Sequence, residues 1–171
     1  YKDGEEISPG DIYAYYERTH ETPKTSAANV EDYVRFFRPY AEAGNKIVYI
    51  GISTEFSSTV TNAQAAAEQF LDAEIHIVDS RNLSTGIGLL VLRACELADG
   101  GMSAADIAGE IRRLTGLARA SFVLDKLEFL RHGGRCSTLT ALGASILSIK
   151  PEIAVRNGTM SNRSKFIGSI A

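Results

Sequence analysis

A loop rich in hydroxyl side chains directly follows the most apolar segment of the chain. That segment is Lys46–Ile52, and the loop carries five hydroxyl residues, Ser53, Thr54, Ser57, Ser58 and Thr59. We predict a strand before the loop and a helix after it, so the first N–H groups of that helix would lie there too. Hydroxyls together with a helix N-terminus bind anions such as phosphate or carboxylate. A helix cap explains any one of these hydroxyls, but a cap does not need five of them.

Three shorter segments are weaker indications of an anion site. Asp79–Ser84 also lies between a predicted strand and a predicted helix, and it carries two serines. Thr25-Ser26 adds two hydroxyls, which a cap or a turn explains equally well. Gly133-Gly134-Arg135 places a cation after two flexible residues, where it could bind an anion or lie at the surface.

Catalytic motifs are scarce in this sequence. A serine hydrolase needs a histidine beside its nucleophile, but His20 lies in a polar loop, His76 lies inside a predicted strand and His132 precedes the double glycine. The sequence has no glycine-rich phosphate motif and no cluster with metal-ligand spacing. We therefore expect no metal site and no catalytic residue. An α/β hydrolase or a phosphate-ligand-binding protein that uses the Ser53–Thr59 loop stays an alternative.

Helical and strand patterns alternate along the chain. We predict helices at Asp11–Thr19, Val30–Ala43, Val60–Leu71, Ser84–Leu97 and Ser103–Leu117, and strands at Lys46–Ile52, Glu74–Val78 and Ala120–Leu124. The apolar spacing of residues 30–43 is that of a helix, and Pro39 is expected to kink or interrupt it. The first strand contains a continuous apolar run, IVYIGI, which is typical of a strand covered on both faces. We expect Glu74–Val78 to be a second buried strand.

These patterns predict an α/β fold. Alternating strands and helices indicate a parallel sheet with helices on both faces. From about Gly133 the pattern changes: a helical turn at 126–131 and a helix at Leu139–Leu147 precede a hairpin of Ile149–Val155 and Thr159–Ser161 around Asn157-Gly158. We therefore divide the chain into a parallel-sheet domain over residues 1–120 and the beginning of a second, antiparallel α+β domain over residues 121–171.

The composition is that of an ordinary globular domain. The 171 residues are 44% apolar, and 18 Lys+Arg against 21 Asp+Glu give a net charge of −3. This balance argues against a nucleic-acid partner, and no apolar run reaches the roughly 20 residues that cross a bilayer. Cys95 and Cys136 follow no disulfide or metal pattern, so we expect reduced thiols and a cytoplasmic protein. Residues 1–4 are typical of a turn inside a domain, so we expect a piece of a longer chain.

Six short motifs occur in order along almost the whole chain. They are Tyr1-Lys2-Asp3-Gly4; Thr25-Ser26; Ile52–Thr59; Asp79-Ser80 with Ser84-x-Gly86-x-Gly88; Gly133-Gly134-Arg135-Cys136-Ser137; and Ile149-Lys150-Pro151. Each is weak alone, but in this order they resemble the DegV family of bacterial fatty-acid-binding proteins. The sequence departs from that family at three positions: Ser58 stands where the family has Gly, Val60 where it has Tyr, and Cys136 where Ile is usual.

The resemblance implies a two-domain protein with a long-chain fatty acid bound between its domains. The family's first strand would then precede residue 1, and most of the second domain would follow residue 171. The resemblance also implies that hydroxyls of two loops bind the carboxylate. Thr25 and Ser57 are the first candidates, and Ser26, Ser58 and Thr59 lie beside them.

A kinase partner is a further implication of the resemblance. Some family members present the bound fatty acid to a kinase, which phosphorylates the carboxylate. The chain itself would then be a binding subunit with no cofactor and no catalysis of its own. Arg135 and Arg163 match the basic residues that serve partner docking or phosphotransfer in such members.

Overall fold

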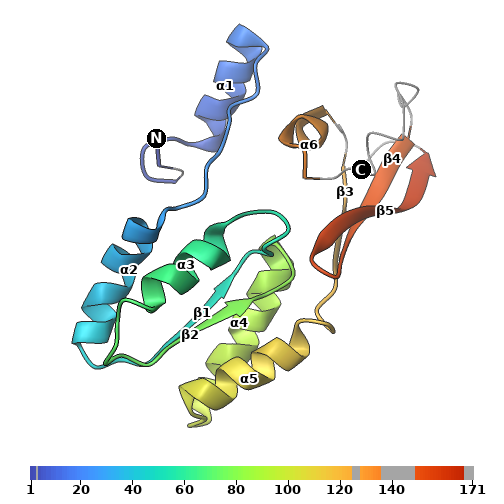
Figure 1. Ribbon diagram of the computed structural model, residues 1–171. Coiled ribbons are helices and arrows are strands. Elements are labelled where there is room, and N and C mark those ends of the chain that lie inside the picture. The colour runs from blue at the N-terminus through green and yellow to red at the C-terminus, as the bar shows by residue number, and fades with distance from the viewer. Residues whose placement is uncertain (3, 125–127, 136–148, 168–171) are drawn as a thin grey trace.

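The structure is a computed structural model that describes residues 1–2, 4–124, 128–135 and 149–167 (Figure 1). Its elements, in chain order, are α1 (Pro9–Thr19), α2 (Val30–Glu42), β1 (Ile47–Gly51), α3 (Thr59–Ala67), β2 (Ile75–Asp79), α4 (Ser84–Asp99), α5 (Ala104–Leu114), β3 (Ala120–Val123), α6 (Glu128–Gly133), β4 (Ile149–Arg156) and β5 (Thr159–Ile167). The helix predicted at Leu139–Leu147 lies outside the described residues. No helix in the described part of the chain has the length and apolar character needed to span a membrane.

β1 and β2 form a parallel pair in which Ile47 lies opposite Ile75 and Gly51 lies opposite Asp79. The pair is covered on both faces, as predicted. Ile47, Tyr49, Ile75 and Ile77 face α2 and α3, where Phe37 is completely buried. Val48, Ile50 and Val78 face α4 and α5, where Ile111 is completely buried. Because successive side chains of a strand point to opposite faces, the apolar residues of these two strands fill two separate cores.

β3, β4 and β5 form an antiparallel sheet in that order. The hairpin of β4 and β5 turns at Asn157-Gly158 as predicted, with φ of 51° and 85°, the positive values that a two-residue type I′ turn requires. The predicted third strand also lies in this sheet, with Ala120 opposite Val155. Antiparallel pairing therefore begins at β3, earlier in the chain than Gly133, where the sequence pattern predicts the change from parallel to antiparallel strands. β3 alternates between half-buried and exposed residues, as expected for a strand with one solvated face.

α2 continues through Pro39 to Glu42, so the predicted interruption does not occur. Pro39 lies in the last turn of the helix and faces solvent. Its missing N–H therefore leaves one carbonyl, that of Arg35, in contact with water and not buried without a partner. Capping boxes begin both α1, at Ser8 and Asp11, and α2.

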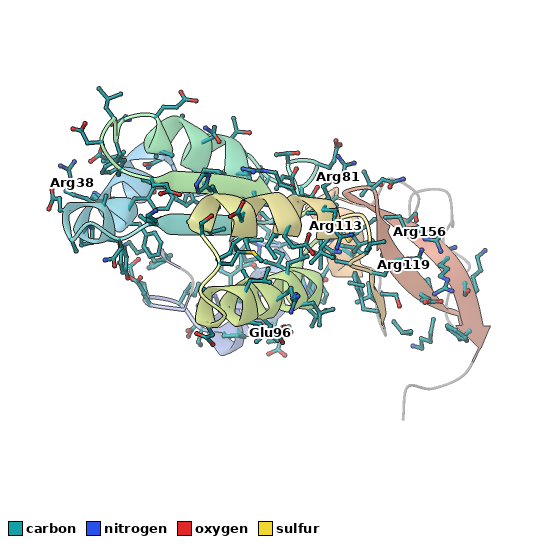
Figure 2. All side chains as sticks on the ribbon, turned by 90° about the horizontal axis from the view of Figure 1, so that it is seen from below. Arg38, Arg81, Glu96, Arg113, Arg119 and Arg156 are labelled. Carbon is teal, nitrogen blue, oxygen red and sulfur yellow. The ribbon has the colours of Figure 1, made fainter. Side chains whose placement is uncertain are left out.

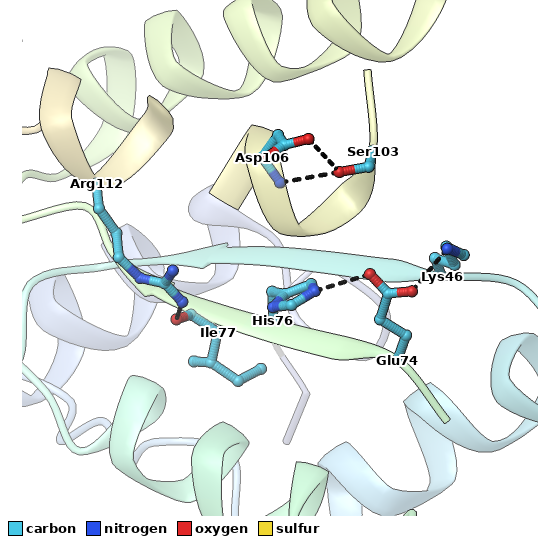
Figure 3. Close-up of polar contacts among 7 residues, drawn as sticks. All are labelled: Lys46, Glu74, His76, Ile77, Ser103, Asp106 and Arg112. Atoms are coloured by element: carbon cyan, nitrogen blue, oxygen red, sulfur yellow. Dashed lines mark hydrogen bonds and ion pairs between the residues drawn. The ribbon is translucent and has the colours of Figure 1, made fainter. Parts of the chain in front are cut away.

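Polar contacts also join the helices and strands away from the carboxyl ends of β1 and β2 (Figure 3). Arg112 on α5 donates to the Ile77 carbonyl at 3.1 Å and ties that helix to β2. At the beginning of the strands, Glu74 lies 2.8 Å from Lys46 and 3.0 Å from His76. Hydrogen bonds from Lys46 and then His76 lower the pKa of the Glu74 carboxyl. His76 therefore has a structural partner, consistent with its position inside a strand.

Candidate ligand pocket at the carboxyl end of β1

The hydroxyls of the loop after β1 do not act as one group. Ser53 is completely buried, and its Oγ donates to the Gly158 carbonyl at 2.8 Å. Thr54 donates to the Asp79 carboxylate at 2.8 Å, which joins the loops that follow β1 and β2. Both hydroxyls therefore hold parts of the protein together, and neither is available to a ligand.

Ser57 and Thr59 lie side by side where α3 begins. Their hydroxyl oxygens are 2.7 Å apart, and the Thr59 N–H donates to Ser57 Oγ at 3.3 Å. Both side chains are half-buried. A hydroxyl has one proton to donate, so one proton of this pair is used internally and the other can be donated to a ligand.

Thr25 and Ser26, in the segment between α1 and α2, line the same pocket as that pair. The segment is held against α3 because Asn62 donates to the Ala28 carbonyl at 2.7 Å. Neither hydroxyl makes a hydrogen bond to another described residue, so both of these protons are available as well.

A pocket of about 360 Å³ brings these hydroxyls together. Its lining combines hydroxyl side chains with apolar ones. The residues that line it are Thr25, Ser26, Ala27, Ala28, Ile52, Phe56, Ser57, Thr59, Leu83, Arg135 and Met160. Its volume is within the range of about 300–1,000 Å³ that is usual for small-molecule sites.

Both sheets contribute to the apolar lining of the pocket. Phe56 and Met160 belong to a buried cluster with Ile153 and Val155 of β4, and Ile52 and Leu83 pack against it. Phe56, Ile52 and Leu83 come from the loops after β1 and β2, whereas Met160 comes from β5. The pocket therefore exists only when the antiparallel sheet is docked on the carboxyl ends of the parallel strands.

Among the described residues, hydrogen bonds from the loops after β1 and β2 reach the hairpin turn and the segment before β3. Besides the bond from Ser53 to Gly158, Arg81 donates to the Asn157 carbonyl at 2.6 Å and Asn82 donates to the Ala118 carbonyl at 2.9 Å. Asn82 is buried, and a Cβ at Gly86 would come within 2.1 Å of its amide oxygen. Sequence reasoning did not single out Asn82, because an Asn in a polar loop has the same sequence pattern whether or not it is buried.

Two of the predicted site residues lie outside the pocket lining. The Ser58 side chain is exposed and caps no helix N–H. Arg163 lies on β5 and forms an ion pair with Glu152 at 3.2 Å. Arg135, in contrast, lies at the pocket beside the hydroxyls, and its guanidinium donates to the Gly133 carbonyl at 2.6 Å.

Groups for catalysis or metal binding do not gather at this pocket. His132 lies 3.1 Å from the Thr22 hydroxyl, and no described histidine contacts Ser57. No group of three or more His, Cys, Asp or Glu residues suited to a metal ion occurs in the described ranges.

Comparison with known proteins identifies the family. Residues 1–170 match the model described as "Uncharacterised protein, DegV family". The chain belongs to the DegV family. A DegV domain-containing protein of Clostridium perfringens is 31% identical over 169 residues, which make up 99% of this chain and 61% of that relative. This DegV chain therefore spans about three fifths of the length of that relative.

Solved DegV structures confirm the α/β fold. A DegV family protein from Thermus thermophilus, described for its fatty acid binding, has 32% identity and a TM-score of 0.85. The match covers 98% of this chain and 60% of that one. The fatty acid kinase B3 protein of Streptococcus pneumoniae, crystallised loaded with linoleic acid, has 27% identity and a TM-score of 0.75, over 92% of this chain and 58% of that one.

Proposed function

We propose that this DegV chain binds a long-chain fatty acid, with the carboxylate at the hydroxyls of Thr25, Ser26, Ser57 and Thr59 and the acyl tail starting along Ile52, Phe56, Leu83 and Met160. The observation that carries this proposal is the mixed lining of one pocket, in which four hydroxyl residues occur together with apolar residues of a buried cluster. The fatty acids bound by the Thermus and Streptococcus relatives support it.

The donor count suits a carboxylate. Thr25, Ser26 and one of the Ser57–Thr59 pair offer three free hydroxyl protons. Hydrogen bonds to a charged acceptor are worth about 1.5–3 kcal/mol each. The hydroxyls can therefore hold a carboxylate that has no fully buried cation beside it, while Arg135 at the exposed rim adds a screened attraction.

The apolar lining of the pocket favours a lipid acid over the alternatives. A phosphorylated sugar or nucleotide would place polar groups against Phe56, Leu83 and Met160, at the cost of burying polar atoms without partners. A hydrolase that uses Ser57 would need a base, and the hydrogen-bond partner of the Ser57 hydroxyl is Thr59. Binding without chemistry by the chain itself is the function that this arrangement supports best.

We further propose that the bound acid is presented to a kinase partner. Arg135 lies beside the hydroxyls at the exposed rim, where a partner can approach the carboxylate. In the proposed reaction a carboxylate oxygen attacks the γ-phosphorus of ATP, the bond between that phosphorus and the bridging oxygen breaks, and ADP leaves. We propose that this reaction takes place in the cytoplasm, because the thiol of Cys95 is free and thiols stay reduced in that compartment.

Ser57→Ala tests the proposed head-group site. The variant loses one donor to a charged acceptor, so fatty-acid affinity should fall by about 1–3 kcal/mol, or roughly five- to 150-fold. Affinity is measured by titration with linoleate after organic extraction, and mass spectrometry of the extract reports any acid that copurified.

Ser58→Ala is the matched control, because that neighbouring side chain is exposed and outside the pocket. It should bind linoleate as the unmodified chain does. Equal affinity in all three proteins would move the carboxylate elsewhere. An extract without fatty acid, together with no binding of added linoleate, would overturn the proposed function.

A further inference from the structure

A second pocket, of about 170 Å³, lies between the end of α5 and the turn of the β4–β5 hairpin. Figure 2 labels the three arginines that line it, Arg81, Arg119 and Arg156. The rest of the lining is neutral: Thr115, Gly116, Ala118, Val155 and Asn157. No residue of this lining is shared with the proposed fatty-acid pocket.

Two of these arginines lie next to the terminal residue pair of β3 and β4. Ala120 of β3 pairs with Val155 of β4 in an antiparallel register. Arg119 precedes Ala120 and Arg156 follows Val155, so the two arginines come next in the same register. Like charges directly opposite each other destabilise a sheet. An anion between the two guanidinium groups would turn that repulsion into attraction.

The third arginine arrives from the parallel sheet. Arg81 follows β2, and its guanidinium donates to the carbonyl of Asn157 in the hairpin turn. Three separate segments of the chain thus bring their positive charges to one small concavity.

No described acidic side chain forms an ion pair with these arginines. The nearby Asp79 carboxylate accepts the backbone N–H of Arg81 and the hydroxyl of Thr54 instead. Carbonyl groups at the end of α5 attract cations, but they carry only partial charge.

We propose that this pocket binds a phosphate-class oxyanion through Arg81, Arg119 and Arg156. Guanidinium groups match phosphate oxygens with paired, charge-assisted hydrogen bonds, and a phosphate group carries about −1.5 to −2 charges at neutral pH. The pocket is too small for a folded segment of another protein. The chain as a whole carries a net charge of −3, which favours a small anion over nucleic acid.

The test is a titration of the full chain with inorganic phosphate at constant ionic strength, followed by NMR of the backbone amides. Phosphate should shift the amides of Gly116, Asn157 and Gly158 in a saturable way. The double variant Arg119→Gln/Arg156→Gln should weaken binding by about tenfold or more, because it removes charged hydrogen bonds. The double variant Arg119→Lys/Arg156→Lys keeps the charge but loses the paired geometry. Its affinity for phosphate should therefore lie between that of the unmodified chain and that of the double Gln variant.

Arg113→Gln is the matched control, since Arg113 lies on α5, pairs with Glu110 and does not line the pocket. It should leave the affinity for phosphate unchanged. Equal shifts with sodium chloride, or equal weakening in the control, would show nonspecific charge attraction and overturn the proposal. A glutamate-rich peptide that binds where phosphate does not would also overturn it, in favour of an acidic protein partner.

Discussion

At the scale of single residues, the five hydroxyl side chains of the loop after β1 have three different roles. Ser53 and Thr54 make structural bonds, to Gly158 and to Asp79. Ser57 and Thr59 face a pocket, and Ser58 faces solvent. Because a hydroxyl both donates and accepts, its sequence position does not reveal its partner. The direction of each side chain, set where the loop turns into α3, determines its role.

Tyr49 gives a prediction about alkaline pH. Burial, and then a hydrogen bond with Tyr33 at 2.9 Å, raise the pKa of the Tyr49 phenol above its ordinary value. The folded state thus favours the protonated form, so this stabilisation is complete below about pH 10, the unfolded pKa, and is lost as the pH rises beyond it. Urea unfolding at stepwise higher pH should show stability falling above about pH 10.

The control for this prediction is a second tyrosine variant. Tyr49→Phe removes the titrating group and should make the alkaline loss of stability shallower. Tyr13→Phe removes an exposed phenol and should leave the slope as it is in the unmodified chain. Identical slopes in all three proteins would show that the Tyr49 phenol does not contribute.

At the scale of elements, the β4–β5 hairpin depends on its turn as much as on its strands. The turn carbonyls of Asn157 and Gly158 accept from Arg81 and Ser53, so the turn is both the end of the hairpin and its contact with the parallel sheet. Gly158 has φ of +85°, and a Cβ there would lie 2.7 Å from Ser53 Oγ. A side chain at this position would strain the turn and separate the sheets.

Gly158→Ala should therefore destabilise the fold and weaken linoleate binding together. The left-handed conformation alone costs about 1–2 kcal/mol for a residue with a Cβ, and the contact with Ser53 adds to that cost. Gly44→Ala is the control, because Gly44 has φ of +75° but no atom near its Cβ position. Urea unfolding should show the larger loss for Gly158→Ala, and only that variant should lose affinity. Equal losses would mean that the close approach to Ser53 has no effect.

At the scale of the whole molecule, the proposed fatty-acid pocket lies where the two sheets meet. Its hydroxyls come from the parallel-sheet part, while Met160 comes from the hairpin and Arg135 follows α6. The boundary at residues 120/121 stays a prediction, but the described contacts make the two parts interdependent. If the carboxylate binds as proposed, a partner that approaches this junction would meet that end of the ligand first.

Arg135→Ala should separate binding from transfer. Arg135 is exposed, so water screens its attraction to the carboxylate, and linoleate affinity should change by less than about threefold. Acyl-phosphate formation with a fatty acid kinase should fall by about tenfold or more, because the transferred phosphoryl group loses a nearby positive charge. Arg163→Ala, which breaks the pair with Glu152 outside the pocket, should reduce transfer less. Collapse of linoleate binding in Arg135→Ala would instead make Arg135 a head-group ligand.

The sequence by itself determined the elements and the class of fold. The apolar run within Lys46–Ile52 and the segment Glu74–Val78 predicted two buried strands, and Asn157-Gly158 predicted a hairpin turn. These features depend on neighbours in the chain, so they can be found in one sequence. The six ordered motifs also indicated the DegV family, which the comparisons confirm.

Only the tertiary structure decided which residues share a surface. It paired β3 with β4 in the antiparallel sheet, placed Arg135 beside Ser57, and left Ser58 and Arg163 outside the pocket. It also brought Arg81, Arg119 and Arg156 together, although 38 and 37 positions separate successive members (119 − 81 and 156 − 119). Such contacts depend on how sheets dock and on the register of their strands. That information is spread over many weak interactions, so no local pattern in the sequence records it.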